Sequence, residues 1–140
     1  WQGARVIAVA SGRHEPLLSE LGVDQFIDYA KRAPEDVVRD VDLVVDAVGG
    51  EKTGRFLRTL KRGGALFPIY PLGFSGTDEA ERLGVTVSAT QVRSNGAQLA
   101  EAGRLLDDGT IRVVIDSSYP LAEERAAQGH IQGKIVLTVE

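Results

Sequence analysis

DLVVDAVGG, residues 42–50, is the most informative stretch of this sequence. Its apolar residues form a short, largely β-branched run that is interrupted only by Asp46, and two glycines follow it. A strand with one face open to water alternates between polar and apolar residues, whereas a strand buried on both faces does not need to. The run therefore predicts a central, doubly buried strand of a parallel sheet. The carboxyl ends of such strands border the ligand crevice of open α/β sheets, so we expect residues 46–50 to face a ligand. The alternative is a buried strand with no ligand near it.

The segments around this stretch alternate between strand and helix patterns. Apolar, β-branched runs predict further strands at 3–10, 23–29, 65–70 and 85–92. Helical spacing predicts short helices at 15–21, 33–39, 53–60 and 79–83. Gly22 is expected to end the first of these helices, and Gly63 and Gly64 the third. This alternation is typical of βαβ units and therefore of a parallel sheet.

The rhythm changes after residue 95. An amphipathic helix is predicted at 97–106, with Asn95 as its cap. Two more strands are predicted at 111–115 and 135–139, joined by a polar segment at 121–132. We therefore divide the chain into residues 1–95 and an appendage of residues 96–140.

Composition narrows the class of protein. The 140 residues are 43% hydrophobic and 26% charged, as in ordinary globular domains. A net charge of −4 argues against nucleic-acid binding, and no apolar run is long enough to span a bilayer. The chain has no cysteine, which excludes disulfides and fits a cytoplasmic location, and its two distant histidines argue against a metal centre. It has no methionine and begins at Trp1, so we expect it to be a piece of a longer protein.

The residues after the strand at 3–10 carry the clearest chemistry. In dinucleotide-binding folds an acid near the ribose selects NAD, whereas a basic residue there accommodates the 2′-phosphate of NADP. Here the acid is missing, and Ser11, Arg13 and His14 stand in its place. A hydroxyl, a guanidinium and an imidazole suit a phosphate dianion. The alternative is a solvated loop with one incidental arginine.

The glycine-rich stretch GGEKTG, residues 49–54, is not a dinucleotide fingerprint, because Glu51 occupies a position that requires glycine. Gly49 and Gly50 remain places where backbone can approach a ligand closely. Asp46 is interpreted as a structural, hydrogen-bonding carboxylate. No catalytic constellation is evident, so the catalytic residues stay unknown.

The blocks GARVIAVASGRH, LGVDQFIDY, DLVVDAVGG, LKRGGALFPI and GKIVLTV, in this order, resemble the medium-chain dehydrogenase/reductase superfamily. They are most similar to its zinc-independent, quinone-oxidoreductase-like branch. The resemblance implies a Rossmann-like, doubly wound parallel sheet, NADP as cofactor, and hydride transfer to quinones, enones or related small carbonyl substrates. It also implies that Ser11, Arg13 and His14 hold the 2′-phosphate with Tyr29 close by. Val48, Gly49 and Ile69 would border the nicotinamide ribose.

The sequence departs from this family in what precedes Trp1. The family's first strand and glycine-rich loop, which would come immediately before Trp1, are lacking here, as is the catalytic domain, against which the end of residues 96–140 is expected to pack. The lacking strand would lie between those at 3–10 and 42–50 and leave two unpaired edges. The resemblance further implies a homodimer formed through sheet edges by the strand at 85–92, and little turnover by this chain alone.

Two other functions remain open at this point. The first is a non-catalytic oligomerisation or interaction module derived from such an enzyme. The second is another Rossmann-like enzyme, such as a methyltransferase, which would need an acid where Ser11 and Arg13 stand.

Overall fold

The computed structural model describes residues 2–88, 93–120 and 133–138. The chain forms two compact units, one of residues 5–93 and the other of residues 1–4 with 94–140. None of the helices in these described segments is long and apolar enough to cross a membrane.

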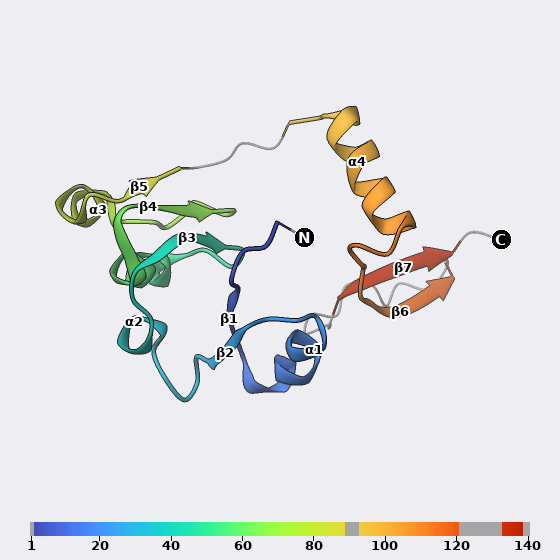
Figure 1. Cartoon of the computed structure of the whole chain (residues 1–140), viewed down its shortest axis with the longest axis horizontal. Helices are drawn as coiled ribbons and strands as arrows, with labels where there is room; N and C mark the ends of the chain where they lie inside the picture. Colours follow the sequence, from blue (N-terminus) through green and yellow to red (C-terminus); the bar gives the residue numbers. More distant parts are fainter. Residues whose placement is uncertain (1, 89–92, 121–132, 139–140) are drawn as a thin grey trace. The chain divides into compact units, whose positions relative to one another are not determined.

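A two-stranded parallel sheet begins the first unit. It pairs β1 (Ile7–Ala10) with β2 (Gln25–Asp28), so that Ala10 lies opposite Asp28. A single 3-10 turn, η1 (Gly12–His14), leads directly into α1 (Glu15–Glu20), which packs beside β2 (Figure 1). Both strands and the helix were predicted at these positions, and each is shorter than expected. Gly22 follows the helix with φ +85°, a conformation that glycine adopts without strain.

A three-stranded parallel sheet completes this unit, in the order β3 (Val41–Asp46), β4 (Leu60–Pro68) and β5 (Thr86–Val87). The short helix α2 (Pro34–Val37) precedes β3. The connections between strands are the 3-10 helix η2 (Glu51–Thr59) and α3 (Thr77–Leu83). This arrangement confirms the predicted parallel α/β fold.

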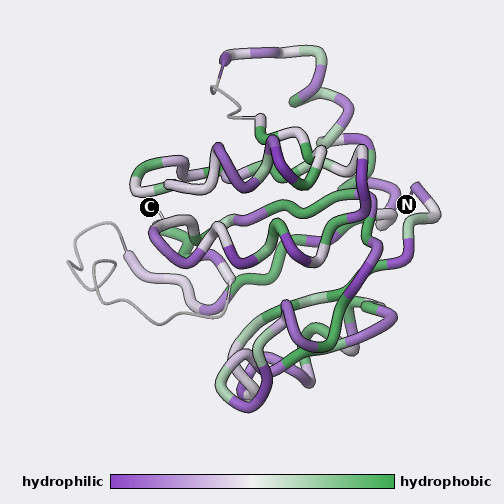
Figure 2. Tube along the Cα trace, turned by 90° about the vertical axis from the view of Figure 1, so that its left-hand side faces the viewer, coloured by the Kyte–Doolittle hydropathy of each residue, from purple (hydrophilic) through white to green (hydrophobic). Residues whose placement is uncertain are grey.

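The core of the first unit lies between one face of this sheet and the two connecting helical segments. Leu57 of η2, Leu66 of β4, Ala80 of α3 and Val85 form its buried centre. Val44 of β3 packs against them. Figure 2 shows long hydrophobic stretches along strands, while helical segments alternate hydrophilic and hydrophobic positions. That alternation is what a helix covering one face of a sheet requires.

The prediction of a doubly buried central strand was wrong. Leu43 and Val45 are 52% and 60% exposed, although Val44 between them is packed. Alternate residues of a strand point to opposite faces, and the core of this unit covers only the face of Val44. β3 is moreover an edge strand, because it pairs with β4 alone among the described strands. β1 and β3 belong to separate sheets among the described strands.

Two further boundaries differ from those predicted. The segment expected as a helix at 53–60 is the 3-10 helix η2, and Lys61–Gly64 belong to β4 instead of ending the helix. The register of β3 against β4 shifts between the pairs Val41–Leu60 and Leu43–Ala65, so β4 carries an irregularity there. Gly63 takes φ +79° at this place, which lets an irregular strand continue. Of the strand expected at 85–92, residues 89–92 lie outside the described residues.

The second unit contains α4 (Gly96–Asp107) and the parallel pair β6 (Ile115–Pro120) and β7 (Lys134–Thr138). The predicted cap is confirmed, because Asn95 Oδ1 accepts a hydrogen bond from the backbone N–H of Gln98 at 3.1 Å. The prediction of a strand at 111–115 was wrong, because β6 begins only at Ile115. The N–H of Ile111 donates to the carbonyl of Leu105 at 3.0 Å, so this segment folds back on the helix end before the strand begins. The polar segment at 121–132 lies outside the described residues.

Candidate functional site

The loop that follows β1 contains the residues predicted to bind phosphate. The N–H of His14 donates to the carbonyl of Ser11 at 2.9 Å, which closes the 3-10 turn. Arg13 is exposed, and its Nε donates to His14 Nε2 at 3.0 Å. The structure therefore places the hydroxyl, guanidinium and imidazole in one tight turn at the carboxyl end of a parallel strand.

Tyr29 lies at the same end of this sheet. It directly follows β2, and its N–H donates to the carbonyl of Ala10 at 3.2 Å. Its side chain is 52% exposed. Since Ala10 immediately precedes Ser11, the backbone of Tyr29 lies beside the start of the turn at Ser11–His14.

An acidic residue that was not predicted also meets this turn. A methyl group placed on Gly12 would lie 2.6 Å from Oδ2 of Asp28, so only glycine leaves room for the carboxylate. The other oxygen, Oδ1, accepts the N–H of Ala30 at 3.0 Å, and Lys31 Nζ lies 3.5 Å from Oδ2. The spacing of Asp28 and Lys31, three residues apart at the end of a strand, is the signal that could have revealed this pair.

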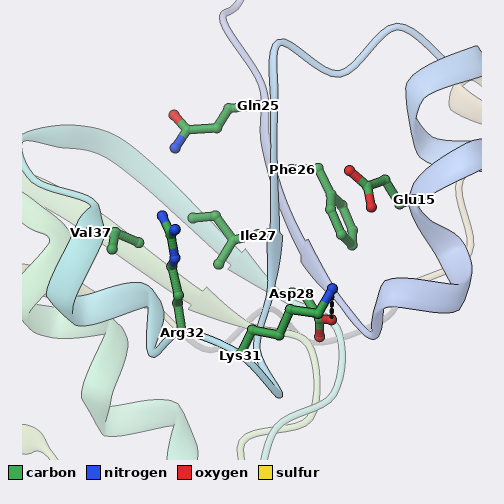
Figure 3. Close-up of a pocket in the computed structure, with 8 residues that line it drawn as sticks. All are labelled: Glu15, Gln25, Phe26, Ile27, Asp28, Lys31, Arg32 and Val37. Atoms are coloured by element: carbon green, nitrogen blue, oxygen red, sulfur yellow. Dashed lines mark ion pairs between the residues drawn. The ribbon is translucent and has the colours of Figure 1, made fainter.

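Asp28 and Lys31 also line a pocket of about 240 Å³ along β2 (Figure 3). Glu15 of α1 and Arg32 contribute one further charge of each sign. Figure 3 shows the Lys31 side chain reaching its amino group to the carboxylate of Asp28. The remaining lining residues are Gln25, Phe26, Ile27 and Val37.

Asp46 organises the loop that follows β3. Its side chain is buried, and Oδ1 accepts the N–H groups of Val48 and Gly49, each at 3.0 Å. Oδ2 accepts the hydroxyl of Thr53 at 2.6 Å. Burial raises the pKa of Asp46, but the hydrogen bonds from Gly49, Thr53 and Val48, with Arg55 nearby, outweigh it and hold the pKa below its usual range. The carboxylate is thus an ionised structural group, as predicted, and a poor proton donor.

The loops after β3 and β4 meet at Gly49. This residue has φ +73°, and a methyl group on it would lie 2.3 Å from the carbonyl oxygen of Tyr70. The N–H of Ile69 donates to the carbonyl of Asp46 at 2.8 Å. Val48 and Ile69 are 86% and 53% exposed. The structure therefore brings together Val48, Gly49 and Ile69. The apolar side chains of Val48 and Ile69 are both exposed there.

Sequence reasoning missed Thr53 and the contact with Tyr70. Thr53 lies seven residues after Asp46, beyond a pair of glycines, and no periodic pattern links the two. A hydroxyl in the first turn after a strand that ends in an acid is the signal that could have suggested it.

Parallel strands whose carboxyl ends carry phosphate-type donors and a glycine-lined backbone define a Rossmann-like dinucleotide domain. The solved structure of the quinone oxidoreductase from Coxiella burnetii superposes on this chain with a TM-score of 0.86. The two are 27% identical, and the match covers 99% of this chain and 46% of that structure.

The zinc-binding dehydrogenase family model matches residues 21–137, and the chain belongs to that family. A relative from Mus musculus, the mitochondrial NAD(P)H oxidoreductase RTN4IP1, is 29% identical over 98% of this chain and 42% of its own length. The chloroplastic NADPH-dependent alkenal/one oxidoreductase of Arabidopsis thaliana is 29% identical over 96% of this chain and 33% of its own length. The chain thus spans less than half the length of these relatives.

The residues present fit a nicotinamide dinucleotide, because the turn at Ser11–His14 offers phosphate donors and a side chain on Gly49 would fill the junction of the two loops. Among the described residues, no group of three or more His, Asp or Glu side chains is placed to hold a metal ion, and the sequence has no cysteine.

Proposed function

We propose that this chain is the cofactor-binding portion of an NADPH-dependent oxidoreductase that transfers hydride to a quinone, an enone or a related small carbonyl substrate. The names of the similar proteins support an oxidoreductase that uses a nicotinamide cofactor. The preference for NADPH rests on the chain's own residues.

The observation that carries the proposal is the turn after β1. Arg13 and His14 are adjacent and hydrogen-bonded, and Ser11 opens the same turn. A guanidinium near a 2′-phosphate forms charge-assisted hydrogen bonds, whereas the 2′-hydroxyl of NADH offers it no negative charge. The turn is therefore suited to distinguish the two cofactors.

The second group of residues has a positioning role in this proposal. A nicotinamide bound here would supply the hydride, and the chain would orient it. Asp46 holds the N–H groups of Val48 and Gly49 inward, so the loop presents an apolar side chain and a bare glycine backbone. These groups suit contact with a ribose and a nicotinamide ring, and none of them would take part in proton transfer.

Further parts of the proposal concern the isolated chain. We expect little or no turnover from it, because it spans less than half the length of the relatives that it matches. We also expect a homodimer through the edge of β5, whose described part is Thr86–Val87. These expectations come from the family resemblance.

Titration with NADPH and NADH in low-salt buffer tests the proposal, because a phosphate contact is weakened by salt. Arg13→Ala is expected to weaken NADPH binding about tenfold and to leave NADH binding nearly unchanged, as loss of a charge-assisted hydrogen bond predicts. The matched control is Arg82→Ala, which removes another exposed arginine that pairs with Glu79 on α3. Equal binding of both cofactors by the wild-type chain would refute NADPH preference, and an unaltered ratio in Arg13→Ala would refute the role of Arg13.

One observation favours the non-catalytic interaction module as a second candidate. Leu43 and Val45 expose apolar surface on β3, which has a free edge among the described strands. Unpaired, apolar edges favour pairing with another chain. Light scattering across a concentration series, with and without NADPH, distinguishes the candidates: association together with no cofactor binding would favour the module.

A further inference from the structure

The carboxylate of Asp28 sits unusually close to the proposed phosphate-binding turn. Its Oδ2 lies against the backbone of Gly12, between Ser11 and Arg13 in the sequence. Its side chain is only 12% exposed, so water screens its charge less than that of a surface acid. An ionised acid here would repel a 2′-phosphate and would instead suit the 2′-hydroxyl of NADH.

Lys31 offsets this charge. Its amino group lies 3.5 Å from the same oxygen, Oδ2, that faces Gly12. The lysine side chain is 76% exposed, so its remaining donors can face a ligand that approaches from solvent. Glu15 and Arg32, which line the same pocket, contribute opposite charges. The net charge at the turn therefore depends on Arg13 and on the ion pair between Asp28 and Lys31.

We propose that the ion pair between Asp28 and Lys31 sets the cofactor preference of the turn at Ser11–His14. This inference rests on the proposed function and adds specificity residues to it. With Lys31 present, the acid is neutralised and the turn keeps the positive charge of Arg13 for a 2′-phosphate. Without Lys31, the unpaired charge of Asp28 disfavours NADPH and leaves the contacts available to NADH unchanged.

Gly12 makes this arrangement possible. A Cβ atom at this position would lie 2.6 Å from Oδ2 of Asp28, so the carboxylate or the turn would have to shift. The backbone of the turn and the acid are therefore packed as one unit, and the charge of the acid acts on whatever the turn binds.

The test compares the NADPH-to-NADH affinity ratio of the wild-type chain, Lys31→Ala and the double variant Asp28→Asn with Lys31→Ala. Asparagine can still accept the N–H of Ala30 through its side-chain oxygen, so the loop after β2 keeps its hydrogen bond. Loss of a partly exposed ion pair predicts that Lys31→Ala lowers the ratio about two- to fivefold. The double variant is expected to restore it to the wild-type value.

The matched control is Lys61→Ala. Lys61 is also an exposed lysine paired with an aspartate, Asp42, but it lies near the start of β4, away from the carboxyl ends of the strands. Its removal changes the net charge equally and is expected to leave the ratio unchanged. Far-UV circular dichroism of each variant establishes that it is folded before binding is measured.

The outcomes separate the inference from the function on which it rests. An unaltered ratio in Lys31→Ala, or a ratio that stays low in the double variant, would overturn the role of the pair while leaving NADPH preference in place. An equal fall in Lys61→Ala would also overturn it, since the effect would then follow net charge alone. A wild-type chain that fails to prefer NADPH would refute the proposed function, and the inference with it.

Discussion

Asp46→Ala should destabilise the first unit far more than removal of any surface acid. The carboxylate accepts three hydrogen bonds, two from the loop after β3 and one from Thr53. The variant deletes the acceptor and leaves all three donors in place. Leaving a donor unsatisfied costs more free energy than the bond itself contributes.

The magnitude follows from where each donor lies. Thr53 is 1% exposed, so its hydroxyl has no access to water and loses about 1–3 kcal/mol. The amides of Val48 and Gly49 lie in a loop where water can replace the carboxylate, which limits their loss to about 0.5–1 kcal/mol each. Relief of the carboxylate's own burial offsets part of this. We expect the free energy of unfolding to fall by about 2–4 kcal/mol.

Urea unfolding followed by far-UV circular dichroism measures this loss, and amide hydrogen exchange at Val48 and Gly49 locates it. Asp42→Ala is the matched control on the same strand. Asp42 is 81% exposed and pairs with Lys61 at the surface, so its loss should change the unfolding free energy much less than the loss of Asp46 does. A loss in Asp46→Ala no larger than that of Asp42→Ala would refute the structural role of the Asp46 carboxylate.

Two further predictions concern the same loops. Because the folded-state pKa of Asp46 lies below its ordinary value of 3.8, its ionised form contributes stability that is complete above that value and is lost as pH falls through the lower pKa. Unfolding free energy measured between about pH 6 and pH 2 should decline less in Asp46→Asn than in the wild type, and parallel curves would contradict this. Gly49→Ala should lower the unfolding free energy by about 2–4 kcal/mol, because alanine would combine the strained φ of +73° with a collision against the Tyr70 carbonyl. The melting temperature should fall accordingly. Gly54→Ala, where a methyl group meets nothing within 4 Å, is its control, and an equal loss there would contradict the packing argument.

The alternation of strands and helices could be predicted from the sequence because it depends on local apolar runs. The residues of β3 and α4 lay within or close to their predicted ranges, and the Asn95 cap was predicted correctly. A cap depends on one side chain and an N–H three residues away, which sequence reading captures directly.

The exposure of β3 could not be predicted in the same way. An unbroken apolar run indicates that a strand can be buried on both faces, but burial also requires other segments to cover both. Here η2 and α3 contribute to the core on one face only. The extension of β4 through Lys61–Gly64 was missed for a related reason, because two glycines after basic residues are typical of a helix end. Pairing with β3 overrode that local preference.

At the candidate site, sequence reasoning located single residues but not the groups that hold them. Ser11, Arg13 and His14 are contiguous, so their common turn could be expected. Asp28 reaches the turn through the register that places it opposite Ala10, and this register is a property of the folded sheet. Thr53 reaches Asp46 only because η2 turns back toward the strand end.

The state of Asp46 bears on where the chemistry of such a protein must lie. A general acid or base near neutral pH needs a carboxyl pKa raised toward 7, whereas the pKa of Asp46 is lowered and both its oxygens already accept hydrogen bonds. Its place at the end of β3 nevertheless puts it directly beneath the two loops that meet at Gly49. A buried carboxylate that accepts three hydrogen bonds and has a lowered pKa shapes the loop around it and is a poor proton donor at neutral pH. This arrangement suits the proposed reaction, in which a bound cofactor would deliver hydride and the protein would position it.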